Sequence, residues 1–188
     1  MKRSQSAGTA DFLFQLGALK RLLRSGWLSI GIAHPESIAG HVFRTVLIGL
    51  LLAKKERADE NKVIKLCLLH DLAEIRTSDL TPLNSKYIKK DDKRAARDVV
   101  KGLFCERELN ELLRELDGGS KEAVVARDAD ALELLIQAKE YLDEGNKYAR
   151  EFITTARKKI KTRSAKEMAR AIENTDSARW WKKEYGLI

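Results

Sequence analysis

Proline and glycine are scarce in this chain, and long apolar runs are missing. Two prolines and 11 glycines among 188 residues leave few positions for the turns that separate the short strands of a β-sandwich. No stretch approaches the roughly 20 consecutive apolar residues that a membrane-spanning helix needs. A glycine-rich phosphate-binding loop is also missing. These absences disfavour a many-turned β protein and a membrane protein.

Cysteine is equally rare. Cys67 and Cys105 are isolated and both lie in apolar segments, so we expect reduced thiols and no disulfide framework. The amino-terminal residues are basic, but Gln15 and Gly17 interrupt their apolar run, and they lack a clear signal-peptide cleavage site. We therefore expect a cytoplasmic protein without membrane attachment.

What the chain does have is positive charge. Its 36 basic and 28 acidic residues give a formal net charge of +8. Seven basic residues and one acidic residue occupy segment 156–170, ARKKIKTRSAKEMAR. Two interpretations stay open: a solvated helix face, or a surface that attracts phosphate-bearing partners at long range. The segment lacks the interleaved aromatic residues of a base-stacking surface, so a nucleic-acid partner is not expected.

Apolar residues recur at helical spacing in almost every segment, and no segment alternates with period two. Helices are expected over residues 12–23, 38–55, 60–76 and 121–142. The prolyl residue Pro82 predicts a loop after the third, Ser120 is placed to cap the last, and Ser164 with Glu167 spells the start of a further helix.

These patterns predict an all-α fold. We expect a single compact multi-helix domain over residues 1–188, with a core at about 10–160 and carboxy-terminal helices over 164–188 packed on it.

Polar residues interrupt the apolar faces of three predicted helices. His70 and Asp71 lie side by side in LCLLHDLAE, and Asp71 has no lysine or arginine four residues away on either side. His41 begins a second helix, and an acid near position 130 lies in a third. Such groups are costly to bury unless they are paired. Each alone is more typical of a satisfied core residue, but together they suit a borderline divalent metal held between helices.

Three segments carry a resemblance to a known family: HPESIAGH at 34–41, LLHDLAEIRTSDLTP at 68–82 and DADALELLIQAKEY at 128–141. They resemble the HD-domain metal-dependent phosphohydrolases and, more narrowly, the 5'-deoxynucleotidase family, from Leu19 to Tyr141. The resemblance implies a compact helical HD fold with its metal site in the helical core. It implies one divalent transition-metal cation (Mn, Co, Zn, Ni or Fe) and release of phosphate from deoxyribonucleoside 5'-monophosphates.

Matched residue by residue, the implied metal ligands are His41, His70, Asp71 and Asp130. Asp130 is preferred to Asp128 because the family's last aspartate precedes a continuation matched here by Glu133. Glu74 matches the catalytic glutamate of the family. Asp79 matches an acid that contacts the sugar 3'-hydroxyl, and we count it with both the catalytic and the substrate residues.

The substrate residues implied by the resemblance are Arg24, Trp27, Asp79, Thr81 and Pro82. Arg24 and Trp27 correspond to residues that hold the phosphate and line the pocket. In some family members the arginine directly precedes the tryptophan, whereas Gly26 has that place here. Arg24 must therefore reach the phosphate from two residues earlier.

The resemblance also fits a homodimer. Two alternatives stay open: an HD activity on nucleoside triphosphates or cyclic nucleotides, and a non-catalytic basic protein that binds nucleic acid. A substrate panel separates the first alternative from a deoxynucleotidase. RNA binding with a steep salt dependence and no turnover would identify the second.

Overall fold

The computed structural model describes residues 5–188, and every regular element assigned in that range is a helix. The first half contains α1 (Gln5–Leu16), α2 (Ser25–Leu28), α3 (Ile38–Glu56), α4 (Glu60–Leu69), α5 (Glu74–Thr77), the 3₁₀ turn η1 (Asn84–Lys86) and α6 (Asp92–Val100). The second half contains α7 (Glu106–Leu116), α8 (Lys121–Asp143), the 3₁₀ turn η2 (Lys147–Ala149), α9 (Arg150–Lys159), α10 (Arg163–Glu173) and α11 (Arg179–Glu184). The predicted all-α fold is confirmed. The first four residues of the predicted domain lie outside the described range.

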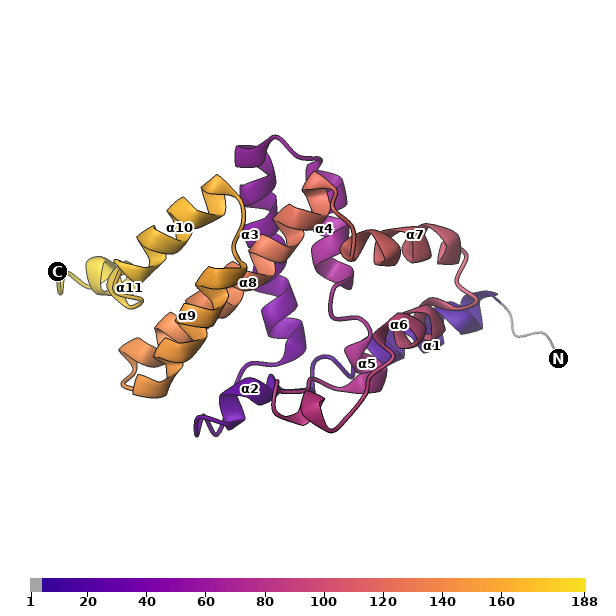
Figure 1. Cartoon of the computed structure of the whole chain (residues 1–188), viewed down its shortest axis with the longest axis horizontal. Coiled ribbons are helices and arrows are strands. Elements are labelled where there is room, and N and C mark those ends of the chain that lie inside the picture. Colours follow the sequence, from indigo (N-terminus) through magenta and orange to yellow (C-terminus); the bar gives the residue numbers. More distant parts are fainter. Residues whose placement is uncertain (1–4) are drawn as a thin grey trace.

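The long helix α8 runs through the centre of the molecule, with α9 and α10 on one side and α4 and α7 on the other (Figure 1). It packs against α3, α4, α9 and α10. Gly49 lets α3 approach α4 closely, because a β-carbon added there would lie 2.7 Å from the Sγ atom of Cys67. None of the helices in residues 5–188 has the length and apolar character needed to cross a bilayer.

Side-chain caps fix where the two central helices begin. The Ser37 hydroxyl accepts a hydrogen bond from the Gly40 amide at 3.1 Å and starts α3. Ser120 accepts from the Ala123 amide at 3.2 Å and starts α8, so the predicted cap at Ser120 is confirmed. Both bonds satisfy an amide that the first turn of a helix leaves without a backbone partner.

The helix predicted over 60–76 is interrupted at its histidine. Helix α4 ends at Leu69, residues 70–73 form a turn, and α5 follows. The Nδ1 atom of His70 lies 2.7 Å from the carbonyl oxygen of Cys67, the acceptor that a continued helix would offer to the Asp71 amide. This local side-chain bond competes with the helix and turns the chain at the His–Asp pair.

The helix predicted over 12–23 is also shorter than expected. Helix α1 ends at Leu16, and a series of turns follows. These turns place Leu19 against Ile38 and Val42 of α3 in a small apolar cluster. Leu19 is thus buried by tertiary contacts and not by a continued helix, Leu22 is partly buried beside it, and Leu23 is exposed.

The cap predicted at Ser164 is wrong by two residues. Thr162 caps α10 by accepting a hydrogen bond from the Ala165 amide at 3.3 Å. Thr162 is itself held by Asp128, whose carboxylate accepts from the Thr162 amide at 2.7 Å. The Ser164 amide instead donates to Glu56 at 3.0 Å. The buried carboxylate on α8 therefore decides where α10 starts.

Candidate metal centre and adjoining cleft

Four candidate ligands from three parts of the chain converge on one point. The Nε2 atom of His41 lies 3.1 Å from Nε2 of His70, 3.2 Å from Oδ1 of Asp130 and 3.6 Å from Oδ2 of Asp71. His70 Nε2 lies 3.2 Å from Asp71 Oδ2. Helix α3 supplies the first imidazole, the turn after α4 supplies the His–Asp pair, and α8 supplies the fourth side chain.

The two imidazole rings are held by their other nitrogens. His41 Nδ1 is hydrogen-bonded to the buried carboxylate of Glu133, and His70 Nδ1 donates to the Cys67 carbonyl. Because both Nδ1 atoms face acceptors, both rings present Nε2 to the centre. Neutral rings in this arrangement point two lone pairs at each other, which is unfavourable without a proton or cation between them.

This donor set fits a divalent cation. A histidine that binds a metal usually donates its second ring N–H to a carboxylate or a backbone carbonyl, and His41 and His70 do so. Two imidazole nitrogens with two carboxylates form the mixed set that Mn, Fe, Co, Ni and Zn accept. The side chains of His41, His70 and Asp71 place their ligand atoms within 4.8 Å of one another.

The electrostatics of the cluster agree with this assignment. Burial lowers the pKa of His41, but hydrogen bonds to Asp130 and Glu133 outweigh it and raise the pKa to about 10. Burial opposes ionisation of Asp71, yet the positive charge on His70 holds the pKa of Asp71 well below its usual range. The carboxylates thus demand positive charge at the centre, which imidazolium protons or a divalent cation can supply.

A second polar layer supports the imidazole of His41. Arg44 donates to Glu133 at 2.8 Å, to Glu140 at 2.8 Å and to Gln137 at 2.6 Å. Glu133 is therefore fixed between an arginine and the His41 ring, with its side chain fully buried. Sequence reasoning missed Arg44. Its position three residues after His41, on the same helix face, is the signal that could have found it.

Glu36 forms a related group with His41 and Glu133, whose ligand atoms also lie within 4.8 Å of one another. Burial and the nearby charge of Glu133 raise the pKa of Glu36 to about 7. Its Oε1 atom accepts a hydrogen bond from the indole nitrogen of Trp27 at 3.1 Å. Because Glu133 already binds Arg44, this group serves as support for His41 better than as a second metal site.

Glu74 lies in the first turn of α5, three residues after Asp71. Burial and the charges of Asp71 and Asp79 raise its pKa to about 8. Its Oε2 atom is buried and makes no hydrogen bond to any residue in the range 5–188. A buried acceptor without a partner costs free energy, so a bound group that donates a hydrogen bond to Oε2 would be favoured here.

Arg24 faces the same cluster from the segment before α2. One guanidinium nitrogen lies 3.5 Å from Asp71 Oδ2. Burial lowers the pKa of Arg24, but the charges of Asp71, Asp130 and Asp79 raise it above the usual value. The guanidinium therefore stays charged beside the cluster, although Gly26 separates it from Trp27.

Asp79 has a structural partner that the sequence did not indicate. Its Oδ2 atom accepts hydrogen bonds from the Ser25 amide at 2.6 Å and the Ser25 hydroxyl at 3.1 Å. This contact ties the loop after α5 to the start of α2, directly beside Arg24. The Oδ1 atom makes no hydrogen bond to the described part of the chain and remains available to a ligand.

Trp27 is almost completely buried, with 1% of its surface exposed. Its ring packs against Phe152 and Tyr141, with centroid distances of 4.5 and 5.1 Å. The Thr81 hydroxyl donates to Asn84 at 2.6 Å and so stabilises the turn that contains Pro82. Trp27 therefore belongs mainly to the core, while the loop at Thr81 forms an edge of the site.

One cleft of about 290 Å³ adjoins the metal cluster. Its walls include the five predicted substrate residues and two of the predicted ligands: Arg24, Trp27, Asp71, Asp79, Thr81, Pro82 and Asp130. Helix α9 supplies a wall that sequence reasoning missed, made of Phe152, Thr155 and Lys159. The cleft brings these seven predicted residues together, whereas His41, His70 and Glu74 do not line it. An apolar and a basic side chain from α9 complete the cleft.

Comparison with known proteins decides the family. A family model described as HD domain matches residues 16–174. The chain belongs to the HD-domain family. It is 34% identical over 145 residues to the 5'-deoxynucleotidase HDDC2 of Dictyostelium discoideum, covering 70% of this chain and 76% of that relative. It is 32% identical over 152 residues to the 5'-deoxynucleotidase HDDC2 of Mus musculus, covering 77% and 75%.

A solved structure agrees with the assignment to the HD-domain family. A conserved hypothetical protein from Pyrococcus furiosus superimposes with a TM-score of 0.74 at 31% identity, over 88% of this chain and 99% of that one. The resemblance drawn from the three sequence segments is confirmed. In this HD domain the His70–Asp71 dipeptide lies in the turn between α4 and α5, where the bend aims both side chains at His41.

Proposed function

We propose that this HD domain is a metal-dependent phosphomonoesterase that hydrolyses deoxyribonucleoside 5'-monophosphates to deoxynucleosides and phosphate. The supporting observation is the single cleft that joins Arg24 and Asp79 to the carboxylates of the metal cluster. The Arg24 guanidinium and a cation held by the cluster would bind a phosphate, and the nearby Asp79 carboxylate would accept a hydrogen bond from a sugar hydroxyl. Relatives named 5'-deoxynucleotidase support the same reaction.

His41, His70, Asp71 and Asp130 would hold the cation. A divalent cation in such a site polarises a phosphate oxygen and lowers the pKa of a bound water. Glu133 and the Cys67 carbonyl keep both Nε2 atoms turned to the centre, so binding requires no rotation of the rings.

Glu74 would move the proton. In the metal-free chain burial and the charges of Asp71 and Asp79 raise its pKa to about 8. A cation held beside Asp71 would lower this pKa, so that the carboxylate could accept a proton near neutral pH. Its unpartnered Oε2 atom is already desolvated. Glu74 would accept a proton from the attacking water and return it to the leaving sugar oxygen.

Arg24 and Asp79 would position the substrate from neighbouring points of the cleft. The guanidinium of Arg24 offers charge-assisted hydrogen bonds to phosphate oxygens, and its contact with Asp71 at 3.5 Å is long enough to yield to them. The free Oδ1 atom of Asp79 would accept a hydrogen bond from the sugar 3'-hydroxyl. Phe152 would supply apolar surface beneath the nucleoside, with the buried ring of Trp27 packed against it.

A substrate panel tests this proposal. Phosphate release is measured from deoxyribo- and ribonucleoside monophosphates, nucleoside triphosphates and cyclic nucleotides, with Mn, Co, Zn and Mg compared. We expect the deoxynucleotides to be cleaved at least about tenfold more efficiently than ribonucleotides, because a buried hydroxyl without a partner costs roughly 1–3 kcal/mol. Equal efficiency on dAMP and AMP, or a preference for triphosphates or cyclic nucleotides, would reject the deoxynucleotidase assignment.

Asp79 provides a second arm of the same test. Asp79→Ala should reduce the efficiency and compress the preference between deoxyribose and ribose, with metal content unchanged. Asp79→Asn keeps an acceptor for the Ser25 amide and separates loss of the sugar contact from loss of the contact with Ser25. Ser25→Ala is the matched control, because it removes one of the two bonds to Asp79 without altering the acid.

We also propose that the protein forms a homodimer. Helix α3 exposes an apolar stripe of Phe43, Leu47 and Leu51, which are 69%, 48% and 54% exposed. Their spacing of four residues places them on one face of the helix. A continuous apolar surface of this kind is typical of an interaction site, and a second copy of the chain offers the same stripe in return.

A further inference from the structure

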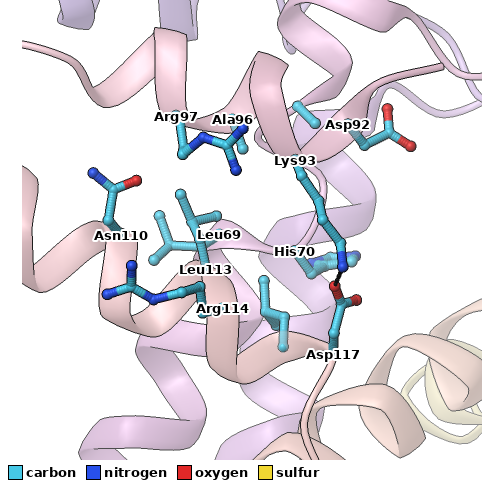
Figure 2. A pocket seen from close by; sticks show the side chains of 12 residues that line it. Leu69, His70, Asp92, Lys93, Ala96, Arg97, Asn110, Leu113, Arg114 and Asp117 are labelled. Atoms are coloured by element: carbon cyan, nitrogen blue, oxygen red, sulfur yellow. Dashed lines mark ion pairs between the residues drawn. The ribbon is translucent and has the colours of Figure 1, made fainter.

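A second cavity, of about 160 Å³, lies between α6 and α7 beside the end of α4 (Figure 2). It shares no lining residue with the cleft that contains Arg24 and Asp79. Part of its wall is apolar and consists of Leu69, Ala73, Ala96, Leu113 and Leu116. The remainder is polar and consists of His70, Asp92, Lys93, Arg97, Asn110, Arg114 and Asp117. Both aspartates are paired with lysines, so the two arginines make the cavity suit a small molecule with one anionic end.

Two arginines at this cavity have no acidic partner. Arg97 of α6 and Arg114 of α7 line it, and neither makes a side-chain hydrogen bond or ion pair with any residue in 5–188. The neighbouring Lys93, by contrast, is paired with Asp117 at 2.9 Å (Figure 2). The opening of the cavity therefore carries two guanidinium charges that the described chain does not neutralise.

Two other arginines on the same helices form ion pairs and serve as a comparison. Arg94 of α6 lies 3.6 Å from Asp98, and Arg107 of α7 lies 3.0 Å from Glu111. Both pairs lie on exposed faces away from the cavity lining. The unpaired arginines are thus the two that face a common hollow.

Asn110 adds a polar atom to the same wall. Its Oδ1 atom is buried and makes no hydrogen bond to the part of the chain that the structure describes. Asn110 lines the cavity from α7, as Arg114 does (Figure 2). Buried acceptors are nearly always satisfied in folded proteins. A ligand that brings a hydroxyl or N–H donor would satisfy this one.

We propose that this cavity is a binding site for a phosphate group, either free phosphate or the monoester of a small hydroxylated molecule. Planar guanidinium groups recognise phosphate oxygens through paired hydrogen bonds. Arg97 and Arg114 take the phosphate, Asn110 accepts from a hydroxyl of the organic part, and the apolar wall packs against its carbon atoms. The cavity shares His70 with the metal cluster. The inference does not depend on the proposed reaction, because the phosphate contacts are assigned to Arg97, Arg114 and Asn110 alone.

The site adjoins the metal cluster from behind. Leu69 and Ala73 line the cavity and flank the turn that carries His70 and Asp71. His70, one of the four proposed ligands, lines the cavity itself.

Hydrogen–deuterium exchange on the full, metal-loaded chain tests the proposal, with inorganic phosphate, ribose 5-phosphate and ribose as probes. We expect the phosphate-bearing probes to slow exchange in residues 92–100 and 106–116, and ribose alone to leave it unchanged. Protection by inorganic phosphate as strong as that by ribose 5-phosphate identifies free phosphate as the ligand. Stronger protection by ribose 5-phosphate identifies a monoester, and Asn110→Ala should then remove the difference between the two probes.

The arginines are tested with a charge-matched pair of variants. The double variant Arg97→Ala/Arg114→Ala should weaken phosphate binding at least about tenfold, because each arginine would lose its charge-assisted hydrogen bonds to the phosphate. The double variant Arg94→Ala/Arg107→Ala changes the net charge equally on the same helices and should bind as the unmodified chain does. Protection that survives in the first variant, or disappears equally in both, would overturn the proposal, as would no protection of these helices by any probe.

Discussion

In His41 and in His70 a hydrogen bond at Nδ1 fixes the ring, and the Nε2 atom is left facing the proposed metal. The anchors differ in kind: a buried carboxylate for His41 and a backbone carbonyl for His70. A carboxylate anchor increases the basicity of an imidazole more than a carbonyl does. Arg44 restrains this effect by binding the other oxygen of Glu133. The two imidazoles thus have the same orientation toward the centre but differ in basicity.

The first prediction at this scale separates ligands from the proton carrier. His70→Ala should lose bound metal and activity together, because it removes one of four donors. Glu74→Gln should keep its metal and lose about 10²–10⁴ in turnover, the usual contribution of a general base. Elemental analysis of the purified variants and their phosphate release provide the two readouts. If Glu74→Gln lost metal as His70→Ala does, Glu74 would be a ligand.

The second prediction concerns the pH dependence of stability. In metal-free protein the folded-state pKa of Glu74 is about 8, against an ordinary value of 4.5. Between these values the folded state holds a proton that the unfolded chain has released. The free energy of unfolding therefore falls as pH rises through this window, and the stabilisation is fully present only below it.

Glu74→Gln removes this titration and should flatten the slope. Urea unfolding of the metal-free chain at about pH 5 and about pH 8 measures it. We expect the unmodified chain to lose more stability over this interval than the variant does. Parallel losses in the two proteins would show that Glu74 titrates near its ordinary pKa in the folded state.

At the scale of helices, the presence of a helix was easier to predict than the residues at which it begins and ends. The long pattern after Ser120 and the run before Lys55 correspond to α8 and α3, whose caps are local serine contacts. The break after Leu69 was missed because the ring of His70 binds the Cys67 carbonyl within its own turn. The spacing of apolar residues gives no indication of such a hydrogen bond. The start of α10 was missed because Asp128, far away in sequence, holds Thr162.

The third prediction tests the close contact between α3 and α4. Gly49→Ala places a methyl group 2.7 Å from Cys67 Sγ and 3.1 Å from Val63, and overpacking of this kind costs about 1–3 kcal/mol. Gly40→Ala is the matched control on the same helix, because its methyl group meets only the Ser37 hydroxyl at 3.6 Å. That change should be neutral or stabilising by up to about 1 kcal/mol. Urea unfolding of both variants measures this difference in stability. An unchanged stability of Gly49→Ala would contradict the prediction.

At the scale of the whole molecule, the site joins segments that no local pattern connects. The proposed ligands could be named from the sequence because the family resemblance fixes their order along the chain. Phe152 and Lys159 could not, since α9 enters the cleft only through its packing on α8. The basic segment noted in the sequence is also divided by the fold: Lys159 lines the proposed active site, while Arg163 is paired with Glu167 at the surface.

The last prediction concerns assembly through the apolar stripe of α3. Leu47 is the central member of the stripe, and Leu47→Asp places a charge where the interface of the proposed dimer would bury it. Desolvating an unpaired carboxylate is costly enough to abolish such a contact. Light scattering coupled to size-exclusion chromatography should give a dimer mass for the unmodified chain and a monomer mass for the variant. Leu187→Asp is the control, because Leu187 is 62% exposed and lies outside the stripe. A monomeric unmodified chain would remove the homodimer, whereas a dimer that survives Leu47→Asp would place the interface on another face.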